Sequence, residues 1–192
     1  MDLSFLFQLP PILLHTTPGS GAIEGFLHPL LGLDHLLAML TVGLLSAQLG
    51  GRAIWTVPAT FVGVMALGGL LGLLGVQIPL VEFGIAVSVI VLGLALLLKA
   101  KLPESIAMFF VAIFAVFHGW AHGAELPAVE SVIIAIAYVV GFLVSTAGLH
   151  VIGALIGYIL LRNQRGTLLL RGSGMLIALA GTWIMVGLLT AA

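Results

Sequence analysis

Long uncharged apolar stretches, separated by short polar breaks, are the feature that most limits how this chain can fold. Only 7% of its 192 residues are charged and 61% are hydrophobic, and the mean hydropathy is +1.32. Soluble domains carry about a quarter charged residues. A helix needs about 20 apolar residues to cross a bilayer. The chain is therefore predicted to be an all-α integral membrane protein.

Six of these stretches are candidate membrane spans, which predicts a six-helix transmembrane bundle. We expect the spans at residues 29–49, 53–74, 80–98, 104–122, 128–161 and 172–189. Pro29 suits the first helical position of the first span. The fifth span is long and rich in glycine, so it is expected to tilt or to break. We assign residues 28–192 to one transmembrane domain, preceded by a separate segment over residues 1–27.

The N-terminal segment is not expected to span the membrane. Residues 1–14 are apolar but are interrupted by Pro10 and Pro11, and the stretch is too short to cross a bilayer. It lacks the basic start and the small-residue cleavage pattern of a signal peptide. We expect a retained interfacial or signal-like segment, followed by a small, polar, glycine-containing linker over residues 15–25.

The cations predict the orientation of the bundle. All of them follow the first, third or fifth predicted span: Arg52, Lys99, Lys101, Arg162, Arg165 and Arg171. Cytoplasmic loops of membrane proteins carry an excess of Lys and Arg. These three loops are therefore expected to be cytoplasmic, and both termini are expected to lie outside.

Charge and cysteine content exclude several classes of protein. The formal net charge is −1, so the chain has no basic surface for nucleic acid. It has no cysteine, which excludes disulfides, thiolate metal sites and thiol catalysis. Any metal site must therefore use His, Asp, Glu or backbone oxygen.

One candidate metal motif ends the fourth predicted span. His118 and His122 are four residues apart, so their rings project from one face of a helix, and Glu125 lies another turn along it. Two imidazoles and a carboxylate suit a divalent transition metal. Gly119 and Gly123 would let another helix, such as the first span, approach this face. The simpler interpretations are hydrogen bonding between helices for the two histidines and an ordinary loop carboxylate for Glu125.

A second candidate motif begins the first span. His28 and His35 are seven residues apart, two turns along one helix face, and Asp34 lies beside His35. Asp34 could accept the ring N–H of a metal-binding imidazole and fix its tautomer. The simpler interpretation makes His28 an interfacial cap and lets Asp34 bond a neighbouring helix. A charge in the bilayer costs about 2.5–3.5 kcal/mol on insertion scales, so it needs a partner or a function.

The predicted topology brings the two motifs to the same membrane depth. The first span enters from outside, and the fourth travels outward and ends at His122. Both motifs should therefore meet on the outward side. His150, in the fifth span, is placed deeper, as a relay on the path of an ion or as a buried polar contact. His15, in the linker, could capture metal, although a lone tail histidine usually has no such role.

At these residues the chain resembles the HupE/UreJ family of nickel and cobalt permeases. The resemblance covers residues 28–39, 117–125 and 141–153, in that order. It implies secondary transport of Ni²⁺ or Co²⁺ and six spans in the mature protein. It also implies a metal role for the residues that match the two His motifs, namely His28, Asp34, His35, His118, His122 and Glu125. Family members often carry a histidine near the mature N-terminus, where His15 lies, but they usually have a clearer signal peptide than residues 1–14.

We therefore expect a non-enzymatic transporter that takes up Ni²⁺ or Co²⁺ across a bacterial-type cytoplasmic membrane. Its partners are the divalent ion, which is its substrate, and the lipid bilayer, and no permanently bound cofactor or particular oligomeric partner is predicted. An intramembrane metal-dependent hydrolase is the alternative, because histidines and an aspartate could hold zinc with an open position for water. The chain has no HExxH motif for that chemistry. A haem-binding cytochrome is a further class, but its axial histidines normally bridge two helices around a porphyrin.

Overall fold

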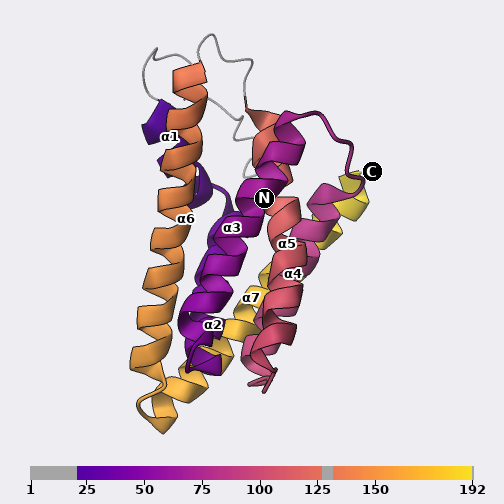
Figure 1. Cartoon of the computed structure of the whole chain (residues 1–192). Coiled ribbons are helices and arrows are strands. Elements are labelled where there is room, and N and C mark those ends of the chain that lie inside the picture. Colours follow the sequence, from indigo (N-terminus) through magenta and orange to yellow (C-terminus); the bar gives the residue numbers. More distant parts are fainter. Residues whose placement is uncertain (1–20, 127–131, 192) are drawn as a thin grey trace.

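The computed structural model describes residues 21–126 and 132–191, and over these ranges every regular element is a helix. The helices lie side by side in an elongated bundle, with α6 running along its full length (Figure 1). In chain order they are α1 (Gly21–Leu31), α2 (Leu33–Leu49), α3 (Ala53–Leu73), α4 (Val81–Leu97), α5 (Glu104–Glu125), α6 (Val132–Leu160) and α7 (Gln164–Ala191).

Four of the described helices are long and apolar enough to cross a membrane: α3, α5, α6 and α7. Helices α1 and α2 pass that test only as a pair, and they are bent by 81° at their junction, as in a broken span or a re-entrant segment. Helix α4 is apolar but shorter. An all-helical, multi-pass membrane protein is therefore confirmed, whereas the count of six spans stays a prediction.

The sequence prediction was wrong at the start of the first span. The linker expected up to residue 25 is helical from Gly21, and Pro29 lies inside α1 rather than at its first position. The helix is interrupted instead at Gly32, between α1 and α2. Gly21 and Gly25 are contact points with α6, since a Cβ on either would collide with the backbone carbonyl of Ile134 or Tyr138. Glycines that resemble a linker in the sequence thus let two helices touch.

Two further boundaries differ from the prediction. The fifth span was expected to tilt or to break, and because helix α6 is continuous, no break occurs between residues 132 and 160. Gly153 of α6 instead lets the backbone of α2 come close, near Leu40 and Gly43. Helix α7 begins at Gln164 rather than at residue 172, so Arg165 and Arg171 belong to a helix and not to a loop.

The helices pack mainly in pairs. Helix α3 makes its most extensive contacts with α5, α4 with α7, and α6 with both α1 and α2. Glycines again mark the close approach of α3 and α5, because a Cβ on Gly119 or Gly123 would collide with the backbone carbonyl of Met65 or Gly69. These two glycines were expected to admit the first span, but it is α3 that lies against them.

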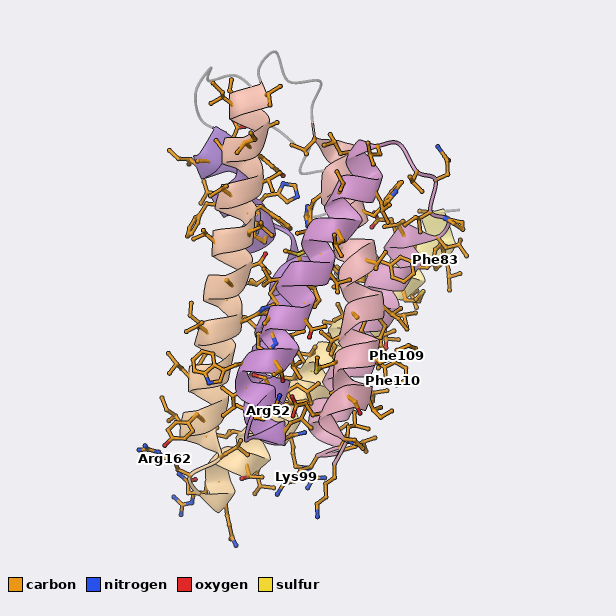
Figure 2. The ribbon with its side chains drawn as sticks, in the orientation of Figure 1. Arg52, Phe83, Lys99, Phe109, Phe110 and Arg162 are labelled. Carbon is orange, nitrogen blue, oxygen red and sulfur yellow. The ribbon has the colours of Figure 1, made fainter. Side chains whose placement is uncertain are left out.

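The basic residues gather at one end of the bundle. Figure 2 shows Arg52, Lys99 and Arg162 there, and Phe83 toward the opposite end. Arg171 Nε donates a hydrogen bond to the Leu97 carbonyl oxygen at 2.8 Å, which ties the start of α7 to the end of α4. The three cation-bearing segments thus share one end, as expected. Which side of the membrane this end faces stays a prediction.

Candidate functional site

The bend between α1 and α2 positions three of the predicted site residues. His28 lies in the last turn of α1, and Asp34 and His35 lie in the first turn of α2. Gly32, between the two helices, has an extended backbone with φ −81° and ψ 115°. A Cβ at Gly32 would lie 3.1 Å from Asp34 Oδ1 and 3.2 Å from His35 Nδ1. The missing side chain therefore leaves room for this polar pair at the bend.

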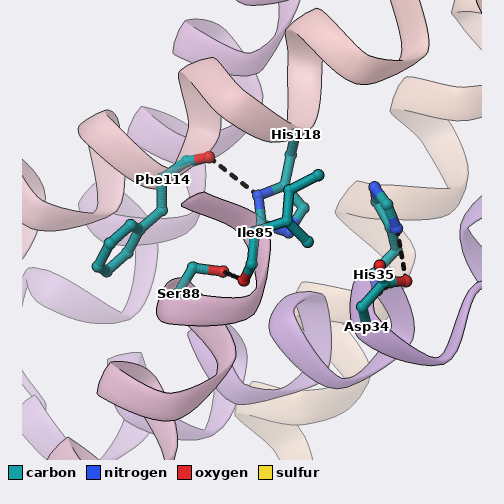
Figure 3. Close-up of polar contacts among 6 residues, drawn as sticks. All are labelled: Asp34, His35, Ile85, Ser88, Phe114 and His118. Carbon is teal, nitrogen blue, oxygen red and sulfur yellow. Dashed lines mark hydrogen bonds and ion pairs between the residues drawn. The ribbon is translucent and has the colours of Figure 1, made fainter. Parts of the chain in front are cut away.

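Asp34 orients the imidazole of His35. Its Oδ1 accepts a hydrogen bond from the backbone N–H of His35 at 2.8 Å and lies 2.8 Å from His35 Nδ1 (Figure 3). A carboxylate can only accept, so Nδ1 carries a proton, and in the neutral ring Nε2 keeps its lone pair. This Nε2 is buried and has no hydrogen-bond partner among the described residues. Metal-binding histidines are held in the same way, with the second ring nitrogen donating to a carboxylate or carbonyl.

His118 is oriented in the same sense by its own helix. Its Nδ1 lies 2.9 Å from the carbonyl oxygen of Phe114, one turn earlier in α5 (Figure 3). A carbonyl only accepts, so Nδ1 donates, and in the neutral ring Nε2 again keeps its lone pair. His118 is fully buried, and its Nε2 also lacks a partner in the part of the chain that the structure describes. Two histidines from different helices therefore present the same free nitrogen.

Four imidazoles from α1, α2 and α5 lie in contact. The ring centroid of His35 lies 5.0 Å from that of His118 and 4.4 Å from that of His122. The rings of His28 and His122 lie 4.7 Å apart. His122 is almost completely buried, and neither of its ring nitrogens is bonded to a described residue. We call His28, His35, His118 and His122 the imidazole cluster; the expected meeting of the two motifs is therefore observed.

Aromatic and apolar residues surround the cluster. The Phe142 ring of α6 lies 4.0 Å from that of His122, and the Phe61 ring of α3 lies 5.4 Å from that of His118. His122 also lines a cavity of about 230 Å³ between α3, α5 and α6. Phe142 lies in the third stretch of the family resemblance, but nothing in the sequence distinguishes Phe61 from the other phenylalanines, and only its tertiary contacts place it at the site.

The cluster is not arranged as a coordination sphere. Over the described ranges, no three His, Asp or Glu side chains are placed so that they could hold a metal ion as they stand. Several of the rings meet edge to face, the usual geometry of packed aromatic rings, and their lone pairs do not converge. Leaving a buried polar group unbonded costs about 1–3 kcal/mol. The chemistry of the cluster therefore favours a ligand that accepts nitrogen lone pairs, bound after the rings rotate.

Of the other predicted site residues, only His150 has its side chain in the described part of the chain. His150 is buried in α6, and its ring lies 5.1 Å from that of Phe61. Phe61 also contacts His118, so its ring touches both His150 and the cluster. Glu125 is the last residue of α5 and not a loop residue as expected. Its side chain, like the whole of His15, lies outside the described part of the chain.

Comparison with known proteins agrees with the motifs. Residues 3–184 match the profile of the family described as HupE / UreJ protein. The chain belongs to the HupE/UreJ family. A curated relative, Protein HupE of Rhizobium leguminosarum bv. viciae, is 44% identical over 181 residues, which cover 92% of either chain. The HupE/UreJ family is associated with nickel and cobalt transport, and membership of it supports a role in metal transport across a membrane. No solved structure matches it significantly.

Proposed function

We propose that this HupE/UreJ member takes up Ni²⁺ or Co²⁺ across the cytoplasmic membrane and binds the ion at the imidazole cluster. The observation that carries the proposal is the convergence of motifs from α1–α2 and α5, with His35 and His118 each presenting an unbonded Nε2. Imidazole suits nickel and related divalent metals. A hydrated ion would exchange water for these nitrogens once the rings rotate about their side-chain torsions.

A carboxylate completes the proposed site. Glu125 follows His122 by about one turn at the end of α5, so it lies at the same end of that helix as the cluster. Asp34 fixes the proton of His35 rather than binding the ion itself, because its Oδ1 lies 2.8 Å from His35 Nδ1. His150 is the proposed relay on the inward side, and His15 is the proposed first contact for the ion.

The membrane potential supplies the driving force for uptake in the proposed orientation. With the basic end in the cytoplasm, the chain crosses the membrane six times, counting α1–α2 and α4 as one span each, and both termini lie outside. An inside-negative potential favours inward movement of a cation by about 2.3 kcal/mol per charge for each 100 mV. A divalent ion gains twice that free energy, which is enough for accumulation without a nucleotide-binding site.

Uptake of radioactive Ni²⁺ and of Co²⁺ into proteoliposomes with an imposed potential tests the proposal. We expect His35→Ala and His122→Ala to lower the initial rate by about 10-fold or more, the range typical of damage to a metal site. Ser88→Ala is the control, because the Ser88 hydroxyl is buried but donates to the Ile85 carbonyl oxygen of its own helix. Normal uptake by both histidine variants, inserted to the wild-type level, would refute the site. Lipid turnover without metal accumulation would favour the hydrolase instead.

A further inference from the structure

Buried hydroxyl groups behave differently on α6 than on the other helices. Five Ser and Thr side chains are buried among the described residues. Thr41, Ser46 and Ser88 each donate to a carbonyl three or four residues earlier in the same helix. Ser145 and Thr146 have no hydrogen-bond partner in the described ranges, although both lie inside α6. A helix offers such carbonyls to any of its Ser and Thr residues, so these two hydroxyls are held away from the usual bond.

Thr146 lies on the face of α6 that joins the cluster to His150. Phe142, Thr146 and His150 are spaced four residues apart, so they form one strip along the helix. The strip spans about 12 Å along the axis. At one end Phe142 contacts His122, and at the other His150 contacts Phe61. Both ring nitrogens of His150 lack a partner among the described residues, as the Thr146 hydroxyl does.

The space around this strip is divided in two. The cavity that His122 lines is bordered on α3 by Met65 and the residues after it. A second cavity, of about 390 Å³, is bordered on α3 by residues 54–62, and His150 lies in its wall. Phe61 is completely buried at this boundary, in contact with His118 and His150.

We propose that Thr146 and His150, with Ser145 beside them, form a second cation position on the inner side of Phe61, separate from the imidazole cluster. The proposal rests on the proposed function, since it concerns the path of the same divalent ion. One imidazole and hydroxyl oxygens make a poorer ligand set for a transition metal than several imidazoles. The inner position therefore holds the ion weakly and with part of its water. Passage through a membrane requires sites that are weak enough to release the ion.

Binding of Co²⁺ to the full-length protein in nanodiscs tests this position directly. Equilibrium dialysis would be done with the double variant His35→Ala/His122→Ala, which lacks two ligands of the cluster. We expect this variant to keep one weakly bound Co²⁺ per chain. Adding Thr146→Val or His150→Ala should weaken that binding by about 10-fold, the effect of losing one interaction of about 1.4 kcal/mol. Absence of residual Co²⁺ in the double variant, or binding that neither added substitution changes, would overturn the proposal.

Transport by otherwise wild-type protein gives an independent measurement. Thr146→Val should lower the maximal rate of Co²⁺ uptake about 10-fold and leave KM unchanged, because the cluster still captures the ion. Thr41→Val is the matched control, since Thr41 is equally buried but its hydroxyl is bonded within α2. Equal rates for these two variants would overturn the inner position. If wild-type protein neither bound nor took up the ion, the proposed function itself would fail, which is a different result.

Discussion

Polar groups are hydrogen-bonded at the basic end of the bundle, whereas several in the imidazole cluster are bonded to no described residue. At the basic end, Arg171 donates to the end of α4, and the Thr56 hydroxyl donates to Glu104 Oε1 at 2.7 Å. In the imidazole cluster, ring nitrogens of His35, His118 and His122 are buried without a partner among the residues that the structure describes. Satisfied polar groups rigidify a structure, whereas unsatisfied ones store free energy that a ligand can recover. The polar groups of the basic end thus hold helices together, whereas the cluster leaves nitrogens available for the proposed ion.

Removing the charge of Asp34 should produce the largest effect on metal binding, and so test the difference between the two regions most directly. Asp34→Asn keeps an oxygen near His35 Nδ1 but loses the ionic acceptor that fixes the tautomer. We expect Ni²⁺ affinity to fall by about 10- to 100-fold, as for other carboxylates behind a metal-binding histidine. The measurement is isothermal titration of Ni²⁺ into the protein in nanodiscs.

Glu104→Gln is the control for this change, because it removes a carboxylate of similar kind at the basic end. Its neutral amide can still accept the hydrogen bond of the Thr56 hydroxyl. It should leave Ni²⁺ affinity unchanged. Equal losses in the two variants would mean that overall charge, and not the orientation of His35, governs binding, and the contrast between the two ends would be lost.

The next largest effect should be a fall in the rate of uptake when the outside medium is acidified. Imidazole binds a metal only when it is neutral, so protons compete with the ion for the same nitrogen. Free imidazole takes up its proton near pH 6.5, so the competition is looked for between about pH 8 and pH 5. The initial rate of Co²⁺ uptake should therefore fall as the outside pH drops through this range. The potential must be clamped, and a rate that stays constant from about pH 5 to 8 would contradict histidine ligation.

The sequence alone predicts the membrane class, the shared basic end and the meeting of the two histidine motifs. These follow from apolar length, from charge placement and from residue spacing, each of which is local. The bend at Gly32 could not be predicted in this way, because it depends on contacts with a distant helix. Gly21 and Gly25 have the same appearance in a linker as at a helix contact, and only the position of α6 decides between the two.

Residue spacing in the sequence also could not predict which residues line the inner side of the proposed site. Phe61 is one of ten phenylalanines, and its importance comes only from touching both His118 and His150. The four-residue spacing of Thr146 and His150 is visible in the sequence. Whether a buried hydroxyl bonds its own helix, as Thr41 does, or is left unbonded is a property of side-chain packing that the spacing does not determine.

Removing a hydrogen bond at the basic end should have the smallest effect of these changes. Arg171→Gln removes an exposed hydrogen bond to the Leu97 carbonyl, which we expect to cost about 1 kcal/mol or less. Arg165→Gln is the control, since Arg165 is also exposed on α7 but has no hydrogen-bond partner in the described ranges. Thermal unfolding should show a drop of a few degrees for Arg171→Gln and none for Arg165→Gln, with Ni²⁺ affinity unchanged in both. Loss of affinity in Arg171→Gln would show that the two ends are coupled, and that the cluster depends on how α4 and α7 are joined.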